Sequence, residues 1–283
     1  MSKRVGILGA TGFIGKHLTV ALLARGDEVR AQSLRDPVAA AAAMADCDVI
    51  VNLGGEPVGQ RWNEDVKRRI AESRTLLPRS FLRELGQLRA TRPQRYISAS
   101  ATGYYGTDET AIFTEDSPPG DDFLARVCVD WEREALRAAD LGMHVARVRT
   151  GFALGTDGGA LAKILPVFKA GGGGRVGSGK QWCSWVHVDD VIGVYLIAID
   201  GADGVFNAVA PNPVRNSDLT RALGKALHRP TLFPVPFAAL KVVLGQGAYI
   251  ATQGQRVVPQ RTLASGYRFK FTELQTALDD LLI

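Results

Sequence analysis

The chain has 283 residues, of which 46% are hydrophobic and 22% are charged, and this composition excludes disordered, collagen-like and coiled-coil proteins. Its length is enough to bury a substantial core. The formal net charge of +5 comes from basic residues spread over the whole length, so we expect solvated helix faces and no nucleic-acid partner.

Short β-branched runs alternate with helical periodicity through the first half of the chain. In chain order, we expect a strand at 5–8, a helix at 12–25, strands at 28–33 and 49–53, a helix at 63–85, a strand at 95–100, a glycine-rich and proline-rich loop at 103–121, a helix at 122–141 and a strand at 145–150. Parallel strands need crossover connections, whose helices bury both faces of the sheet. The order therefore predicts an α/β fold, a Rossmann-type doubly wound parallel sheet.

Beyond residue 150 this alternation loosens. A glycine cluster at 171–174 and prolines at 211 and 213 precede a helix–loop–helix composition. We expect residues 1–150 to form the Rossmann-type domain and residues 151–283 to form a smaller C-terminal substrate lobe, with segments that return to the first domain.

A glycine-rich turn joins the first expected strand to the first expected helix. Gly9, Gly12 and Gly15 are spaced GxxGxxG. The first makes a tight turn, the second lets a pyrophosphate approach the backbone, and the third lets the helix pack closely on the strand. The turn therefore predicts a dinucleotide site. Its expected contacts are Gly9, Thr11, Gly12, Phe13, Ile14 and Gly15.

The second expected strand ends without the carboxylate that would accept hydrogen bonds from the ribose hydroxyls of NAD. Ser33, Leu34 and Arg35 stand there instead. A hydroxyl and a planar guanidinium suit a 2′-phosphate, which favours NADP(H) over NAD(H). Asp36 would oppose that phosphate if the loop turned it inward.

Further motifs carry a resemblance to a known family. The segments at 48–55, 96–106 and 185–191 resemble the ribose-side strand end, the active-site strand with its Tyr-Gly loop, and the His-Val-Asp-Asp segment of extended short-chain dehydrogenases/reductases. Shorter matches are similar to the atypical "epimerase family protein" subgroup, which is NAD-dependent epimerase/dehydratase-like and has its own C-terminal domain. These matches are Arg61-Trp62, Ser73-Arg74, Gly103-Tyr104-Tyr105-Gly106, Trp131-Glu132, Arg149-Thr150-Gly151 and 259–263.

The resemblance implies more about the cofactor site and the assembly. It adds Leu53, Gly54, Gly55, Arg74 and Ser98 as cofactor contacts. It also implies a homodimer through the helices that flank the sheet.

The catalytic pair typical of this superfamily is missing. Its members place Tyr and Lys four residues apart on one helix, so that the lysine charge lowers the pKa of the phenol. Here the two positions are Leu124 and Cys128, on an apolar helix stripe. We expect Cys128 to be a buried small residue and no nucleophile.

Hydroxyl groups near the expected nicotinamide position are the remaining catalytic candidates: Ser100, Thr102 and Tyr104, with Ser98 and Tyr105 close by in the sequence. Alternatively, Ser100 and Thr102 cap the turn and the tyrosines pack under the loop.

Later residues divide into substrate-side candidates and structural ones. On the substrate side we expect Arg149, Lys180 and a mobile loop at 171–174. We expect His187 to be a packing residue, with Asp189 or Asp190 as the N-cap of the following helix.

Three cysteines, Cys47, Cys128 and Cys183, form no CxxC pair, which indicates neither a disulfide framework nor a thiolate metal site. We expect no metal ion and a reducing, cytoplasmic location. Lys16 and His17 interrupt the N-terminal apolar stretch, and no other stretch supplies the ~20 apolar residues of a membrane span, so we expect no membrane association.

Two functions remain open at this point. The first is an NADP(H)-dependent oxidoreductase or epimerase that acts on a small hydroxyl- or carbonyl-containing substrate, a sugar nucleotide being one option. The second is a non-catalytic NADP(H)-binding sensor or regulator, which the missing Tyr/Lys pair makes reasonable.

Overall fold

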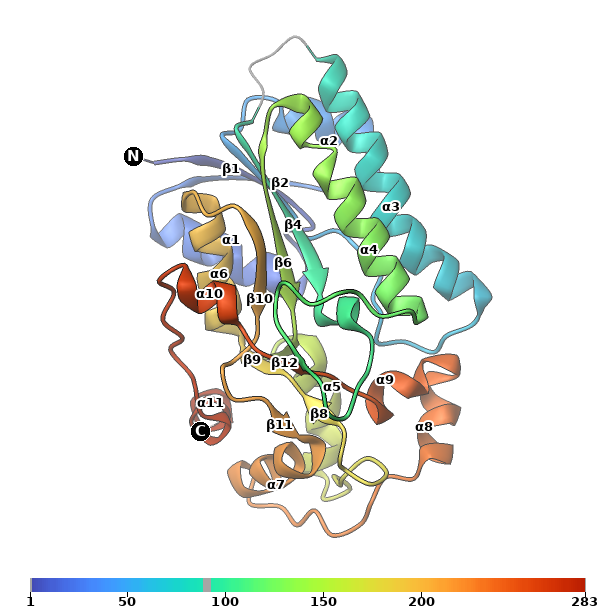
Figure 1. Cartoon of the computed structure of the whole chain (residues 1–283). Helices are drawn as coiled ribbons and strands as arrows, with labels where there is room; N and C mark the ends of the chain where they lie inside the picture. The colour runs from blue at the N-terminus through green and yellow to red at the C-terminus, as the bar shows by residue number, and fades with distance from the viewer. Residues whose placement is uncertain (1, 89–92, 283) are drawn as a thin grey trace.

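A six-stranded parallel sheet forms the centre of the protein (Figure 1). The computed structural model describes residues 2–88 and 93–282. The strand order is β10-β6-β4-β3-β1-β2. The chain winds outward from β1 in both directions, which is the expected doubly wound arrangement. The strands are β1 (Arg4–Leu8), β2 (Glu28–Gln32), β3 (Val49–Asn52), β4 (Arg95–Ala101), β6 (His144–Thr150) and β10 (Gly204–Ala208).

Helices cover both faces of this sheet (Figure 1). Buried side chains of α1 (Phe13–Ala24) and α6 (Val188–Asp200) share one apolar cluster with the strands. Those of α2 (Pro37–Met44), α3 (Glu64–Gln87) and α4 (Phe123–Leu136) share a cluster on the opposite face. This two-sided cover explains why β3 is apolar without alternation.

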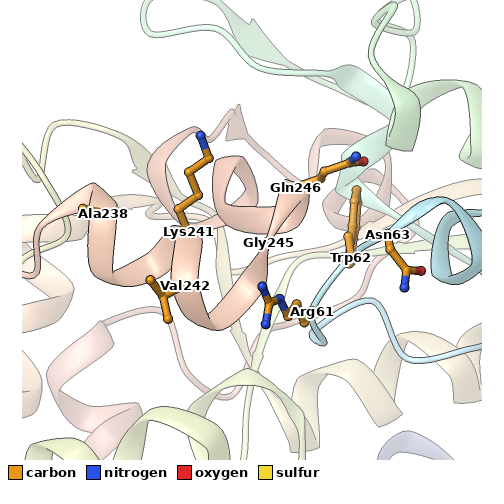
Figure 2. Close-up of a pocket in the computed structure, with 8 residues that line it drawn as sticks. All are labelled: Arg61, Trp62, Asn63, Ala238, Lys241, Val242, Gly245 and Gln246. Atoms are coloured by element: carbon orange, nitrogen blue, oxygen red, sulfur yellow. The ribbon is translucent and has the colours of Figure 1, made fainter.

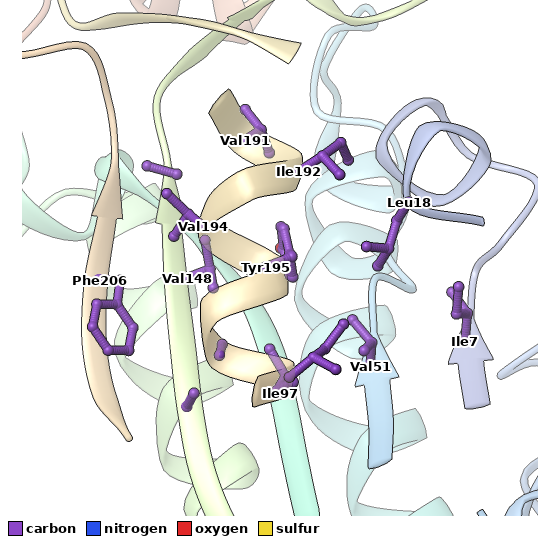
Figure 3. Packing of buried hydrophobic residues seen from close by; sticks show 14 of the residues in the cluster. Ile7, Leu18, Val51, Ile97, Val148, Val191, Ile192, Val194, Tyr195 and Phe206 are labelled. Carbon is purple, nitrogen blue, oxygen red and sulfur yellow. The ribbon is translucent and has the colours of Figure 1, made fainter. Parts of the chain in front are cut away.

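The face under α6 is densely packed (Figure 3). Val194 and Tyr195 point from α6 toward the strands, and both side chains are fully buried. Phe206 of β10 lies in the same cluster at 2% exposure. The sheet therefore takes its last strand and one covering helix from beyond residue 150.

The remaining elements form a smaller lobe at the carboxyl ends of the strands and connect it to the sheet (Figure 1). Its short strand pairs are β7 (Phe152–Leu154) with β9 (Trp185–His187), β8 (Trp182–Cys183) with β11 (Val214–Arg215), and β5 (Ile112–Phe113) with β12 (Arg256–Val257). Its helices are α5 (Gly159–Lys169), α7 (Asn216–Ala226), α8 (Phe237–Leu244), α9 (Tyr249–Thr252), α10 (Gln260–Ala264) and α11 (Leu274–Leu282). The short 3-10 helices are η1 (Thr102–Tyr105), η2 (Ala139–Leu141) and η3 (Gln246–Ala248).

Three local expectations need correction. The helix expected at 122–141 stops at Leu136 and is followed by η2, and the loop expected at 103–121 contains η1 and β5. The N-cap of α6 is His187, whose Nδ1 accepts a hydrogen bond of 3.1 Å from the Asp189 N–H. Asp190 is fully buried and instead accepts hydrogen bonds from the backbone of Lys270 and Phe271. His187 is itself buried, as expected of a packing residue.

A buried carboxylate attaches the C-terminal segment to the sheet. Glu115 is 5% exposed and accepts hydrogen bonds from the backbone N–H groups of Asn207 at 3.0 Å and Arg261 at 3.0 Å. Thr262 donates to it through both its N–H at 3.3 Å and its hydroxyl at 3.2 Å. Within the described part of the chain, no helix is long and apolar enough to cross a membrane.

This anchor gives a stability prediction. In Glu115→Gln, an amide N–H₂ group replaces one carboxylate oxygen and cannot accept a bond from the Arg261 N–H. We expect the free energy of unfolding, measured by urea denaturation, to fall by about 1–3 kcal/mol. The control is Asp116→Asn, whose carboxylate pairs with Arg261 at the surface and is 74% exposed. Its change should stay within about 0.5 kcal/mol. Equal effects for the two variants would contradict the assignment.

Candidate functional site

The glycine turn has the geometry that its spacing predicts. Gly9 has a φ of +88°, which favours glycine. A Cβ on Gly15 would lie 2.4 Å from the Gly9 carbonyl oxygen, whereas one on Gly12 would lie 3.3 Å from it. Gly12 is the N-cap of α1 and no side chain of the described residues caps this helix, so its first-turn N–H groups point to the turn without a side-chain acceptor. Such an end binds anions.

The side chains around this turn point in different directions. Thr11 is exposed, and Ile14 packs against the sheet core. The Phe13 ring is enclosed by three glycines: Gly155 and Gly158 of the loop between β7 and α5, and Gly159, the first residue of α5. A Cβ on any of Gly155, Gly158 or Gly159 would come within 2.4, 2.6 or 2.9 Å of that ring. Sequence reasoning missed the packing of these three glycines around the Phe13 ring, although their spacing in the sequence was a visible signal.

The end of β2 presents two polar groups and no free carboxylate. Ser33 and Arg35 are exposed, and the Ser33 hydroxyl accepts a hydrogen bond of 3.2 Å from the Arg35 N–H. The Arg35 guanidinium pairs with no residue that the structure describes. Asp36 caps α2 by accepting a bond of 3.0 Å from the Ala39 N–H, so its carboxylate is committed to that helix. Leu34 is buried beneath the strand end.

The end of β3 lies against the glycine turn. A Cβ on Gly9 would lie 3.0 Å from the Leu53 carbonyl carbon, and one on Gly55 would lie 3.0 Å from Cζ of Arg74. Asn52 holds this segment in place: its Oδ1 accepts from the Gly54 N–H at 3.0 Å. Its Nδ2 donates to the Tyr96 hydroxyl at 2.9 Å. The structure thus brings the expected contacts of β1, β3 and α3 together. Asn52 was missed, although a polar residue ending a buried strand was a signal for it.

The hydroxyls of β4 are buried on the side of the sheet that α4 covers. The Ser98 hydroxyl donates to the Ala99 carbonyl at 2.9 Å, and the Ser100 hydroxyl donates to Oε1 of Glu132 at 2.7 Å. Thr102 is 8% exposed. The alternative that Ser100 caps the turn is wrong, because the N-cap of η1 is Ala101 and no side chain caps this helix.

The two positions of the missing catalytic pair do face the end of β4. A Cβ on Gly103 would lie 3.5 Å from Cβ of Leu124 and 3.9 Å from Sγ of Cys128. Burial raises the pKa of the Cys128 thiol to about 12, so it is neutral at physiological pH. The expectation that Cys128 is buried is confirmed.

Arg149, expected on the substrate side, is an interior residue. It is 3% exposed, and its Nε and Nη2 bind the two carboxylate oxygens of Glu132 at 2.7 and 2.9 Å. Its Nη1 donates to the Tyr105 hydroxyl at 2.9 Å. Burial opposes the charge, but the bonds to Glu132 raise the pKa of Arg149 above its usual range. The guanidinium is committed to protein groups and is not free for a substrate.

The two tyrosines of the loop have different surroundings. The Tyr105 hydroxyl donates to Oδ1 of Asn207 at 2.7 Å, and burial raises the pKa of this phenol to about 12. The Tyr104 ring lies against the Arg149 guanidinium, with 3.4 Å between its centroid and Cζ. Among the described residues, none receives or donates a hydrogen bond at the Tyr104 hydroxyl.

The second half of the expected substrate-side loop at 171–174 is packed, whereas Gly171 and Gly172 are exposed. A Cβ on Gly173 would lie 2.4 Å from the Phe168 ring, and one on Gly174 would lie 1.8 Å from the Phe233 carbonyl oxygen. Lys180 is exposed beside β11, where Arg215 donates a hydrogen bond to its carbonyl oxygen. The structure therefore brings neither element together with the glycine turn.

An open pocket of about 760 Å³ lies between α8 and the loop before α3 (Figure 2). Trp62 stands at its edge, with its backbone N–H bonded to the Leu244 carbonyl at 3.0 Å and its ring in edge contact with Tyr249. Lys241 and Val242 leave α8 in opposite directions, Val242 on the side of Arg61 (Figure 2). The described residues contain no cluster of three metal-ligating side chains.

The turn yields a stability prediction. Alanine is the better helix former by about 1 kcal/mol, yet Gly15→Ala should destabilise the protein by about 1–3 kcal/mol, because the added methyl meets the Gly9 carbonyl. Gly12→Ser, which adds a favoured N-cap side chain and whose Cβ would lie 3.3 Å from the Gly9 carbonyl oxygen, should change the free energy of unfolding by less than about 0.5 kcal/mol. Chemical denaturation of both variants tests the contrast, and a stabilised Gly15→Ala would refute the close approach.

Comparison with known proteins identifies the family. The model of the NAD dependent epimerase/dehydratase family matches residues 5–208. A model of a domain of unknown function, DUF1731, matches residues 235–281. The chain belongs to the NAD-dependent epimerase/dehydratase family, and the resemblance seen in its motifs is confirmed.

Curated relatives carry the name "Epimerase family protein". The chain is 39% identical to the SDR39U1 homolog of Arabidopsis thaliana, described as chloroplastic, over 97% of this chain and 85% of that protein. It is 37% identical to SDR39U1 of Homo sapiens, over 99% of each chain.

Solved structures agree with this assignment. Human SDR39U1 with NADPH has a TM-score of 0.92 at 35% identity, over 99% of both chains. The nucleoside-diphosphate sugar epimerase of Corynebacterium glutamicum has a TM-score of 0.82 at 34% identity, over 100% of this chain and 58% of that chain. UDP-glucose 4-epimerase of Thermotoga maritima, at 17% identity and a TM-score of 0.81, shares the fold.

Proposed function

We propose that this protein is an NADP(H)-dependent oxidoreductase or epimerase that acts on a small hydroxyl- or carbonyl-containing molecule. The observation that carries the proposal is the continuous edge formed by Gly9, Leu53, Gly55 and Arg74, next to an α1 end that no side chain of the described residues caps. NADP(H), when bound, supplies hydride transfer. The chain's residues bind and orient it.

The preference for NADP(H) rests on the end of β2. Arg35 is exposed and unpaired among the described residues, and Ser33 is beside it. Asp36 caps α2 by accepting a hydrogen bond from the Ala39 N–H through Oδ1. The NADPH bound to human SDR39U1 supports this choice. A planar guanidinium binds a phosphate through two parallel hydrogen bonds.

Tyr104 is the best placed proton donor of the three catalytic candidates. Ser100 is committed to Glu132 and Thr102 is buried, whereas the Tyr104 hydroxyl is unpaired among the described residues. The Arg149 guanidinium against its ring fixes the ring's orientation. The name of the Corynebacterium glutamicum relative supports a nucleoside-diphosphate sugar as one substrate class.

Two further parts of the proposal concern the cellular compartment and the oligomeric state of the protein. The three cysteines are free, which supports a reducing, cytoplasmic compartment. A homodimer through the helices flanking the sheet rests on resemblance, and size-exclusion chromatography with light scattering tests it.

The cofactor preference gives a direct prediction. NADPH should bind more tightly than NADH in calorimetric titrations. Arg35→Ala should weaken NADPH binding by about 10- to 100-fold while leaving NADH unchanged, because only NADPH carries the 2′-phosphate. Arg30→Ala is the matched control, since Arg30 is also on β2 but pairs with Asp46. Absence of NADPH binding by the wild-type protein would remove the proposed function altogether.

A sensor is the second candidate, and one observation favours it. The hydroxyls of Ser100 and Tyr105 are committed to buried partners, and α4 carries neither member of the usual catalytic pair. Such a protein would bind NADP(H) and change its shape or its partner binding with the redox state.

Hydride exchange separates the two candidates. An enzyme should transfer label from deuterated NADPH to some member of a panel of carbonyl compounds, nucleoside-diphosphate ketosugars included. Tyr104→Phe should slow that transfer by at least about 100-fold without changing the NADPH dissociation constant. Lack of transfer to any member, together with hydrogen-exchange protection that differs between NADPH and NADP⁺, would favour the sensor.

A further inference from the structure

The charges of the C-terminal lobe are distributed unevenly along the chain. The stretches 158–188 and 219–272 contain no Asp or Glu, although both contain several Lys and Arg residues. The first stretch includes α5 and β8, and the second includes most of α7 and all of α8. The cations of this lobe therefore face solvent unless a carboxylate from another part of the chain reaches them.

Four cations at the outer end of this lobe have no carboxylate partner among the residues that the structure describes. We call them the basic rim: Lys169 at the end of α5, Arg175 in the loop after it, Lys225 in the last turn of α7, and Arg229 in the loop after that helix. All four are exposed. Arg175 donates to the Ser178 carbonyl oxygen at 3.2 Å, and Arg229 donates to the Lys169 carbonyl oxygen at 3.0 Å. The carboxylate of α7, Asp218, pairs with Arg221 of the same helix at 3.0 Å.

The segment between α7 and α8 carries two exposed apolar side chains next to this rim. Leu232 is 79% exposed and Phe233 is 81% exposed, and we call this pair the apolar tip. The segment forms the outer edge of the lobe, at the opposite end of the molecule from α2 (Figure 1). The Phe233 carbonyl oxygen lies against Gly174, where a Cβ would be 1.8 Å away, so the tip is also close to Arg175 in the chain.

Backbone contacts and prolines restrain the segment that carries the tip. The Val235 N–H donates to the Arg175 carbonyl oxygen at 2.8 Å, and the Gly177 N–H donates to the Val235 carbonyl oxygen at 3.1 Å. Prolines at 230, 234 and 236 fix φ at three positions of the segment. The two apolar side chains are thus held in water, and exposed apolar groups bordered by polar residues mark interaction sites.

An anionic lipid surface matches both the tip and the rim. Its acyl region buries apolar side chains, and its negatively charged headgroups attract Lys and Arg side chains. A second copy of this chain is a poorer match, because a two-fold contact would bring the basic rim of one copy against that of the other. A nucleic acid would neutralise the rim but would leave Leu232 in water.

We propose that the apolar tip and the basic rim bind the surface of an anionic membrane. Leu232 and Phe233 enter the boundary between headgroups and acyl chains, and the four cations of the rim contact the lipid headgroups. This peripheral mode needs no spanning helix. It replaces our expectation of no membrane association, which considered spanning segments alone. The inference goes beyond the proposed function and does not depend on a bound cofactor.

Co-sedimentation of the full-length protein with vesicles tests the proposal. Vesicles of phosphatidylcholine with about one quarter phosphatidylserine should bind the protein at least about tenfold more tightly than vesicles of phosphatidylcholine alone. Raising the salt concentration from about 0.1 M to about 0.5 M should weaken binding, because salt screens the rim. Phe233→Ser and Leu232→Ser should each weaken binding by about tenfold or more. Lys169→Glu combined with Lys225→Glu should weaken it by about 10- to 100-fold.

Matched variants separate this surface from general effects of hydrophobicity and charge. Val20→Ser removes a side chain that is 68% exposed on α1 and should leave binding unchanged. Arg68→Glu combined with Arg83→Glu on α3 alters the net charge as much as the double variant of the rim, and should weaken binding by less than about threefold. Circular dichroism checks that each variant is folded. In Phe233→Trp, brominated acyl chains should quench more fluorescence than in the wild-type protein, which reports insertion of the tip directly.

Three results would overturn the proposal. The first is a wild-type protein that does not bind the anionic vesicles, or binding that persists unchanged in both serine variants of the tip. The second is rim-dependent binding of a single-stranded oligonucleotide without vesicle binding, which assigns the surface to a nucleic acid. The third is dimerisation in light scattering that both serine variants abolish, again without vesicle binding, which assigns the surface to a second copy of the chain.

Discussion

The buried ion pair between Glu132 and Arg149 is the interaction on which the rest of the site depends. Both residues are 3% exposed, and two hydrogen bonds of 2.7 and 2.9 Å join their side chains. Their burial is tolerated because neighbours complete the hydrogen bonding: Ser100 donates to the carboxylate and Tyr105 accepts from the guanidinium. Removing either charge would leave the other buried and unpaired.

This pair also joins parts of the chain that are far apart. The Tyr105 hydroxyl donates a hydrogen bond to the Asn207 side chain on β10. The Asn207 backbone N–H donates to Glu115, which also accepts a hydrogen bond from the Thr262 N–H. Several short motifs that carried the family resemblance therefore meet in one network. Their physical role is to fix the loop after β4 and the C-terminal segment. The hydroxyls of Ser100 and Tyr105 donate hydrogen bonds within this network, although they would otherwise be candidates for catalysis.

The sequence predicted the parts of the candidate site that depend on local backbone geometry. The spacing of Gly9 and Gly15 follows from a tight turn and a close helix approach, both of which are properties of a few consecutive residues. The packing of three glycines around Phe13 and the hydrogen bonds of Asn52 depend on contacts between segments that are distant in the sequence. The glycine spacing and the polar end of β3 signalled that these residues matter, but propensity and periodicity do not identify their distant partners.

The sequence by itself determined the doubly wound sheet, the family and the dinucleotide turn, because strand and helix periods and glycine spacing are local and repeat along the chain. Only the tertiary structure decided what the charged residues do. Arg149 and Arg74 are both arginines near expected sites, yet one is paired with Glu132 inside the protein and the other keeps two nitrogens unpaired among the described residues. That difference depends on whether a carboxylate from another element lies within reach, which is settled when the helices pack on the sheet.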